Sequence, residues 1–300
     1  MKIKRLDRRR ALRWLVVLAL VAIVVLYIIV PAAFGIAVIF PYQESVGAPP
    51  AGFEEIDLTT DDGVRLTAWY APPSNGAAII LIHGAGGSRE GVRDHAALLV
   101  ENGYGVLALD LRGHGESDGT TNRFGWQGTR DVGAAVAFLR QRDEVEAIGG
   151  LGLSLGGEVL LGAASEYPEL RAIVADGATQ RSVAELRALE SERPLYRNFT
   201  ARVMYATVQL ITGQKPPKPL LDSMREAGST VFLLIAAGSN DMEIKFNDMF
   251  AATVGERATL WVAPEAGHTG AFSRYPDEYE QRVIGFFDAA LLEQDNDLPS

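Results

Sequence analysis

Short, wholly apolar segments that alternate with helical segments limit what this chain can fold into. A strand that is apolar along its whole length is buried on both faces, which is typical of a parallel sheet covered by helices on each side. The pattern therefore predicts an α/β domain. The apolar segments are 77–82, 105–109, 147–153, 172–175, 231–237 and 259–263, and the helical ones lie at about 89–102, 126–142, 156–167, 242–254 and 276–292.

Two further segments belong to this domain: one forms its beginning and the other interrupts the alternation of strands and helices. Residues 53–71 alternate apolar and polar positions around Asp61-Asp62-Gly63, which predicts a strand hairpin. Residues 178–228 break the alternation, and we expect an insertion there that forms a small cap over the strand ends; a surface excursion without a role is the alternative. The domain is expected over 53–292, with a C-terminal tail at 293–300.

The N-terminal part has the character of a membrane anchor. Residues 14–40 form an apolar stretch. It contains Pro31, which we expect to kink or end a first helical part. A bilayer core requires about 20 apolar residues, so this stretch is long enough to span it. Residues 41–52 then predict a linker to the domain.

Charge next to the apolar stretch predicts its orientation. Residues 1–13 contain seven Lys and Arg residues and one Asp, and no basic residue follows the stretch until Arg65. This asymmetry predicts a cytoplasmic N-terminus, a single-pass helix and a domain outside the cytoplasm. A cleaved signal peptide ending near 46–48 is the alternative, although signal-peptide apolar regions span only about 7–15 residues.

Composition excludes several classes of function. The chain has a net charge of −10 despite its basic N-terminus, so its domain is acidic and unsuited to nucleic-acid binding. It has no cysteine, which rules out disulfides, cysteine nucleophiles and thiolate metal sites. No phosphate-binding or dinucleotide-binding fingerprint occurs, so no cofactor and no metal are expected.

The strongest motif is Gly152-Leu153-Ser154-Leu155-Gly156, which matches G-x-S-x-G between an apolar strand and a helix. Such a strand-to-helix turn, a nucleophile elbow, exposes the serine at a helix N-terminus, where free N–H groups favour negative charge. Ser154 is therefore the candidate nucleophile. The alternative is a glycine-rich turn with a helix-capping serine.

A serine nucleophile needs a base and an acid, and in folds with a nucleophile elbow of this kind the three residues occur in the order Ser, acid, His along the chain. Of the four histidines, only His268 follows Ser154, and it comes directly after the last apolar segment. Asp241 follows the segment 231–237 through a short turn and is the candidate acid. Asp176, at the end of the preceding strand, is its rival.

The segment His83-Gly84-Ala85-Gly86-Gly87 follows the strand at 77–82. Glycines there allow backbone N–H groups to face an open cavity and form an oxyanion hole. Ala85 is the first expected donor, with Gly86 as the alternative, and the N–H of Leu155 is the second. His83 is expected to be structural.

Together these motifs resemble the α/β-hydrolase superfamily, in particular its esterases, lysophospholipases and serine aminopeptidase-like members. The segment 110–117, Asp-Leu-Arg-Gly-His-Gly-Glu-Ser, adds to the resemblance and corresponds to a loop that is usually structural in the family. The resemblance implies an α/β-hydrolase fold and a Ser154–Asp241–His268 triad, over about residues 53–292. It leaves the substrate open.

The expected activity is hydrolysis of a carboxylic ester through an acyl-enzyme, with an apolar acyl substrate favoured by the cap aromatics and the anchor. Thioester or peptide hydrolysis uses the same residues. A non-catalytic binding protein on this fold is a further alternative, because fold alone does not establish activity.

Overall fold

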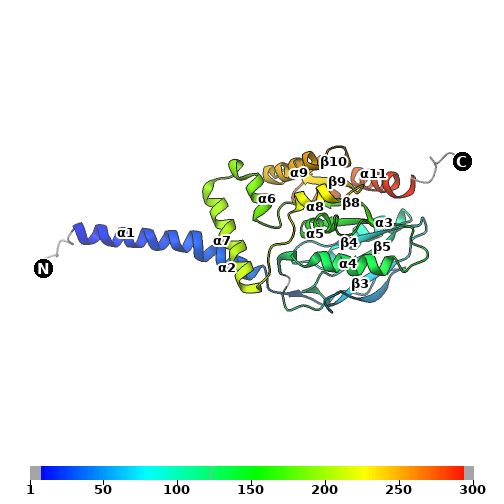
Figure 1. Cartoon of the computed structure of the whole chain (residues 1–300), viewed down its shortest axis with the longest axis horizontal. Helices are drawn as coiled ribbons and strands as arrows, with labels where there is room; N and C mark the ends of the chain where they lie inside the picture. Colours follow the sequence, from blue (N-terminus) through cyan, green and yellow to red (C-terminus); the bar gives the residue numbers. More distant parts are fainter. Residues whose placement is uncertain (1–7, 122, 294–300) are drawn as a thin grey trace.

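The computed structural model describes residues 8–121 and 123–293; the predicted tail therefore falls almost wholly outside the described residues, as does most of the basic N-terminal segment. An eight-stranded sheet in the order β10-β9-β8-β7-β4-β5-β3-β2 forms the centre of the domain (Figure 1). Neighbouring strands from β5 to β10 are parallel, and β3 is antiparallel to both of its neighbours. The strands are β2 (Glu54–Thr59), β3 (Arg65–Ala71), β4 (Ala77–Ile82), β5 (Gly105–Leu109), β7 (Ala147–Leu153), β8 (Leu170–Asp176), β9 (Val231–Ala237) and β10 (Ala258–Ala263).

Helices cover both faces of this sheet, as the fully apolar strands require. Along β4, Ile80 and Ile82 pack into one core, and Ile79 and Leu81 pack into the other. Helices α4 (Gly128–Leu139), α5 (Leu155–Ala163) and α9 (Asp241–Val254) contribute to the first core. Helices α3 (Arg93–Glu101), α10 (Ala271–Arg274) and α11 (Pro276–Phe287) contribute to the second. The predicted α/β-hydrolase fold is confirmed.

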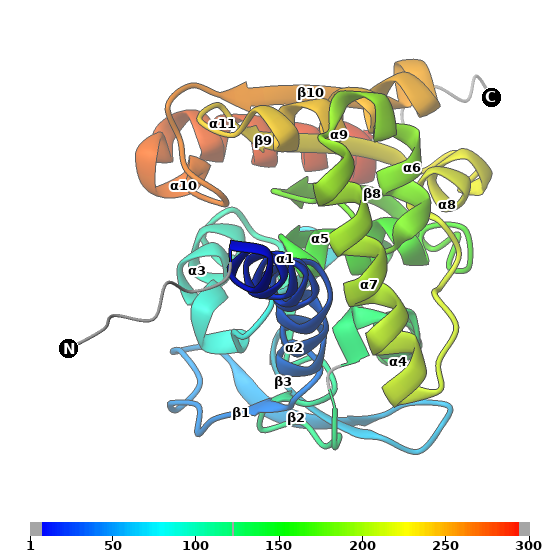
Figure 2. The same ribbon diagram turned by 90° about the vertical axis from the view of Figure 1, so that its left-hand side faces the viewer.

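Three helices occupy the segment between β8 and β9, where the sequence predicts an insertion. They are α6 (Val183–Ala188), α7 (Leu195–Thr212) and α8 (Leu220–Glu226). Ser182 and Glu185 form a capping box at the start of α6, which explains where this helix begins. Figure 2 shows α6 and α7 in front of the sheet, on the side from which α1 projects.

One helix in the described part of the chain, Arg9–Ala37, is long and apolar enough to span a membrane. It comprises α1 (Arg8–Val24), a π-helical turn (Val25–Ile29) and α2 (Val30–Ala37). Pro31 was expected to kink or end the first part, yet the helix continues through it. The π-helical turn ends two residues before this proline, and its one additional residue per turn accommodates the missing N–H and the bulk of the ring.

The segment after this helix is attached to the domain by strand pairing and by further hydrogen bonds, among them those of Glu44 with Ser88 and of Ala48 with Arg93. Within the predicted linker, β1 (Tyr42–Gln43) pairs in parallel with β6 (His114–Gly115), a short strand in the loop that follows β5. The end of the N-terminal helix is therefore held at the carboxyl edge of the sheet.

Candidate active site

Ser154 lies in a strained turn between β7 and α5. Its backbone has φ 50° and ψ −113°, a conformation that non-glycine residues rarely adopt. The turn also depends on two glycines: a Cβ on Gly152 would lie 2.3 Å from the carbonyl carbon of Gly156, and one on Gly156 would lie 2.4 Å from the carbonyl oxygen of Ile82. The G-x-S-x-G motif thus forms the predicted elbow because no side chain fits at its first and last positions.

The serine hydroxyl lies beside His268, as the sequence predicts. The distance from Nε2 of His268 to Oγ of Ser154 is 2.8 Å. His268 is in the loop after β10, and Ser154 follows β7. Because both strands are parallel in one sheet, their carboxyl ends bring these residues together from 114 positions apart in the sequence.

The carboxylate that contacts His268 belongs to Glu243, so the expected pairing with Asp241 is wrong. Nδ1 of His268 is 2.7 Å from Oε2 of Glu243, whose side chain is fully buried. The backbone N–H of Ala237 donates to the other carboxylate oxygen at 2.6 Å. Asp241, in contrast, is exposed.

Helix capping explains why Glu243, and not Asp241, contacts His268. Asn240 caps α9 by accepting a hydrogen bond from the N–H of Glu243, which makes Asp241 the first helical residue and Glu243 the third. Helical side chains point back toward the N-terminus, so the third residue reaches the end of β9. The sequence does contain a signal for this: Asn240 followed three residues later by a glutamate is the spacing of a capping box.

Asp176, the rival acid, lies beneath the site without a hydrogen bond to His268 in the described structure. Its side chain is buried, and no hydrogen-bond partner of Oδ2 is found among the described residues. Burial, and then the charge of Glu243, raise the pKa of Asp176 to about 7. Its backbone carbonyl accepts a hydrogen bond from the N–H of Ser154 at 2.7 Å, so this residue supports the elbow through its main chain.

The hydrogen bond to Glu243 raises the pKa of His268 above its usual value, and the charge of Glu243 adds to this, against a smaller opposing effect of burial. In the neutral tautomer, Nδ1 donates to the carboxylate and Nε2 is left to accept from the serine hydroxyl. The arrangement thus orients the unprotonated nitrogen of His268 toward Ser154. This orientation is what proton removal from the hydroxyl requires.

The glycine-rich loop after β4 lies against the nucleophile. A Cβ on Gly84 would be 3.5 Å from Cβ of Ser154. The N–H of Gly87 donates to the carbonyl of Gly84, which closes a turn with Ala85 and Gly86 at its exposed tip. Leu155 is the first residue of α5, where an N–H has no acceptor within the helix. The predicted donors Ala85 and Leu155 therefore remain a prediction that this geometry supports.

His83 and the 110–117 loop have structural contacts. Burial lowers the pKa of His83 to about 4, so its ring is neutral. Nδ1 then donates to the carbonyl of Gly84 at 2.7 Å, and Nε2 accepts from the N–H of Leu111 at 3.2 Å. Asp110 forms a fully buried ion pair with Arg89. These contacts hold the glycine-rich loop and the 110–117 loop together behind the site.

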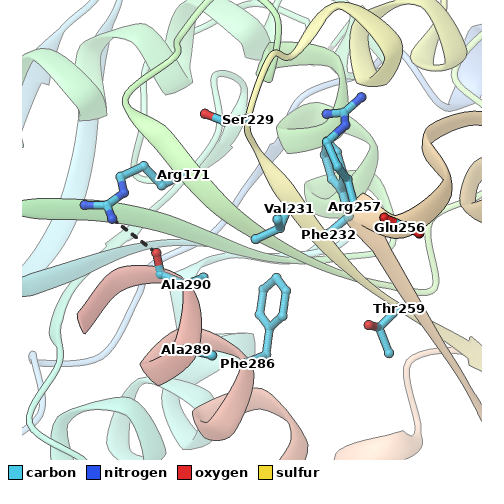
Figure 3. A pocket seen from close by; sticks show the side chains of 10 residues that line it. All are labelled: Arg171, Ser229, Val231, Phe232, Glu256, Arg257, Thr259, Phe286, Ala289 and Ala290. Atoms are coloured by element: carbon cyan, nitrogen blue, oxygen red, sulfur yellow. Dashed lines mark hydrogen bonds between the residues drawn. The ribbon is translucent and has the colours of Figure 1, made fainter. Parts of the chain in front are cut away.

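The described cavities lie away from Ser154. One of about 340 Å³ is lined by Arg171, Val231, Phe286 and neighbouring residues, at the amino ends of β8, β9 and β10 (Figure 3). Arg171 donates to the carbonyl of Ala290 there. Its lining includes the hydroxyls of Ser229 and Thr259 but no histidine that could activate them, so it does not compete with the Ser154 site. Among the described residues no cluster of His, Asp or Glu is arranged to hold a metal ion.

A serine, a histidine and a carboxylate aligned at the carboxyl edge of this sheet define the class of protein. Residues 77–289 match the alpha/beta hydrolase fold family, so the chain belongs to that family. The match begins with β4 and ends within the turn after α11, and it therefore includes the whole candidate site.

The chain is also similar to individual proteins. The chain is 27% identical to the uncharacterised protein YfhR of Salmonella typhi over 94% of this chain and 97% of the relative. It is 30% identical to the thiohydrolase aneE of Aspergillus aculeatus over 57% and 55% of the two chains. Its fold is similar to that of the Pyrococcus furiosus esterase Pf2001, with a TM-score of 0.68 and 23% identity over 85% of this chain and 98% of the esterase.

Proposed function

We propose that this protein is a serine hydrolase that cleaves a carboxylic ester through an acyl-enzyme intermediate. The observation that carries the proposal is the continuous contact from the Ser154 hydroxyl through His268 to the buried carboxylate of Glu243. In this scheme Ser154 is the nucleophile, His268 the general base and acid, and Glu243 the carboxylate that orients the imidazole.

The reaction follows from this geometry. His268 Nε2 takes the hydroxyl proton as Oγ of Ser154 attacks the acyl carbon, and the carbonyl oxygen becomes an oxyanion. The N–H groups of Ala85 and Leu155 would stabilise that charge. The protonated His268 then donates its proton to the leaving alkoxide, and the alcohol departs. Water attacks the acyl-enzyme in the same way, with His268 as base, and releases the acid and free Ser154.

Glu243 suits the role of the orienting acid because its environment keeps it in one position. One oxygen accepts from the N–H of Ala237, and the other contacts His268 and the side-chain amide of Asn240. As His268 becomes an imidazolium, the adjacent carboxylate stabilises the new positive charge without taking the proton.

The leaving group separates the candidate substrates. Ser154, His268 and Glu243 would serve a thioester or an amide equally well, and the similarity to the thiohydrolase aneE favours the thioester as the second candidate. The apolar N-terminal helix and the exposed aromatic residues Tyr196 and Phe199 favour an apolar acyl chain. We further propose that the helix anchors the domain on the outer side of the membrane.

A fluorophosphonate probe tests the nucleophile, because a serine activated by a base attacks phosphorus readily. The full chain in detergent should be labelled once, at Ser154. Labelling should be lost in Ser154→Ala and in His268→Ala, and the double variant should be no worse than either, since the residues act as a unit. Labelling that persists in folded Ser154→Ala would overturn the assignment, and an unlabelled wild-type protein would favour a non-catalytic role.

A matched substrate panel tests the leaving group. One acyl chain should be presented as a p-nitrophenyl ester, a thioester and an anilide, and the panel repeated with chains of increasing length. The ester should have the highest kcat/KM, and longer acyl chains should be preferred. A higher kcat/KM for the thioester would move the assignment to the second candidate.

A further inference from the structure

The cap helix α7 has an exposed apolar stripe along its length. The exposed fractions of Leu195, Phe199 and Leu210 are 83%, 46% and 84%, and Ala206 is also exposed. Together with the half-buried Val203, these residues follow one another at intervals of four, four, three and four, which places them on one face of a helix. We name this set the α7 stripe.

The stripe is additional to the face that α7 buries in the domain. Tyr205 and Val208, on the opposite side of the helix, are 2% and 0% exposed and belong to the core. A surface helix of a water-soluble domain normally has one apolar face, turned toward the core. A second apolar face that stays exposed indicates contact with another apolar phase or partner.

The N-terminal helix lies directly beside the stripe. The rings of Tyr27 and Tyr196 meet edge to face with centroids 6.3 Å apart. Eight residues further along each of the two helices, a Cβ on Gly35 would lie 2.8 Å from the carbonyl oxygen of Met204, so only glycine permits this approach. In Figure 1, α7 crosses the end of the N-terminal helix, and in Figure 2 the two helices lie side by side on the face of the domain from which the N-terminal helix projects.

The length of the N-terminal helix indicates the depth of this contact. Trp14 follows the last basic residue, Arg13, and begins the apolar stretch. A hydrocarbon core of about 30 Å takes about 20 residues at 1.5 Å each, so its outer boundary lies near Phe34. Tyr27 precedes Phe34 by seven residues and lies roughly 10 Å inside that boundary. Tyr196 contacts Tyr27, and the start of α7 is therefore at the level of the lipid.

From these observations we propose that α7 is a second membrane-contacting element, with its stripe inserted in the outer leaflet beside the N-terminal helix. An interfacial helix of this kind buries its apolar face about 5–10 Å into the headgroup and acyl boundary. The proposal rests on the membrane insertion and hydrolase activity proposed above. Its occupant is the lipid bilayer, and the continuity of the stripe with the membrane-spanning helix selects it over a protein partner.

The position of α7 also bears on the substrate. Tyr42, just after the N-terminal helix, pairs with the loop after β5, and a Cβ on Gly86 would lie 3.9 Å from its ring. The glycine-rich loop beside Ser154 is therefore close to the point where the chain leaves the membrane. A substrate that reaches this edge from the bilayer is a lipid with an ester-linked acyl chain, and we infer this substrate class for the site.

The cysteine-free sequence permits a direct test of depth. Three variants of the full chain each contain one cysteine: Phe199→Cys, Leu210→Cys and Asp143→Cys. Each cysteine is labelled with an environment-sensitive fluorophore, and the protein is reconstituted in phosphatidylcholine vesicles. Asp143 is the control, since it is exposed in the turn before β7, at the opposite edge of the sheet. Probes at 199 and 210 should be quenched by spin-labelled lipid and protected from aqueous iodide, and the probe at 143 should behave in the opposite way.

Two results would overturn the proposal. Iodide access at 199 and 210 equal to that at 143 would place the stripe in water. Protection from iodide without quenching by lipid would mean that protein, such as a second copy of the chain, covers it. Neither measurement depends on catalysis, so a failure of the proposed hydrolase activity would be recognised separately.

An activity measurement tests the substrate class. The double variant Phe199→Ser, Leu210→Ser changes only exposed side chains, and Asp143→Ser is its matched control. Hydrolysis of an ester embedded in vesicles should fall about tenfold or more in the double variant, from the apolar burial it loses, and stay unchanged in the control. Both variants should retain wild-type turnover of a short water-soluble ester. Equal rates of double variant and wild type on the embedded ester would refute the inferred substrate class.

Discussion

Replacing Glu243 with glutamine tests the central contact of the proposed mechanism with almost no change in shape. The carboxylate accepts on both oxygens, from the N–H of Ala237 at 2.6 Å and toward Nδ1 of His268 at 2.7 Å. A glutamine amide can accept on one side only. If its oxygen keeps the bond to Ala237, its NH₂ group faces His268 and drives the proton to Nε2, so that the imidazole no longer accepts from Ser154.

The expected loss of activity is large because this is the wrong tautomer. Replacing the acid of a Ser-His-Asp triad by its amide lowers kcat by about 10⁴, which is roughly 5.5 kcal/mol of transition-state stabilisation. If the amide flips instead, its NH₂ group faces the N–H of Ala237, and a buried donor left unpaired costs about 1–3 kcal/mol of folding stability. We therefore expect kcat/KM to fall by about 10³–10⁴ with the fold retained.

The assay is ester hydrolysis by the full chain in detergent, with thermal unfolding as the check on folding. Asp241→Asn is the matched control, since it makes the same chemical change two residues earlier at an exposed position. It should change kcat/KM by less than about twofold, within the range of surface substitutions. A folded Glu243→Gln protein with near-wild-type activity, or a large loss in Asp241→Asn, would refute the assignment of the acid.

Three other predictions concern protonation and topology. The kcat/KM should decline as pH falls through the pKa of His268, and the midpoint should lie above the usual value of about 6.5 because Glu243 raises this pKa. In Glu243→Gln the residual activity should have a lower midpoint. A midpoint unaffected by the substitution would contradict the role of this contact. Asp176 keeps its proton in the folded state up to a pKa of about 7 but loses it near 4 when unfolded, so between these values the free energy of unfolding falls with rising pH. In urea unfolding, the free energy of unfolding of Asp176→Asn should therefore fall less steeply with pH than that of the wild type, by up to about 1.4 kcal/mol per pH unit. Identical slopes in the two proteins would show that Asp176 is ionised in the fold. A reporter fused to the C-terminus should be active only outside the cytoplasm, and a mature protein beginning near residue 48 would replace the anchor by a cleaved signal peptide.

The periodicity of the sequence was enough to predict the fold. Strands such as 77–82 and 231–237 are apolar throughout, so only burial in a sheet covered on both faces suits them, and the structure confirms these bounds. The contact between Ser154 and His268 was also predictable, because each follows a strand of one parallel sheet and carboxyl ends share an edge. Sequence patterns near a residue predict its position correctly when that position depends only on the strand that the residue follows.

The acid and the path of the N-terminal helix were decided by the tertiary structure. Asp241 and Glu243 are two residues apart on α9 and thus point in very different directions, so the choice between them depended on where Asn240 begins the helix and how β9 meets the loop of His268. The α7 stripe indicates contact with the membrane only because the N-terminal helix packs beside it at Gly35, and this contact joins segments that are far apart in the chain. Sequence determines which side chains are available and with what periodicity; which of them share a site depends on contacts that form only when distant elements pack together.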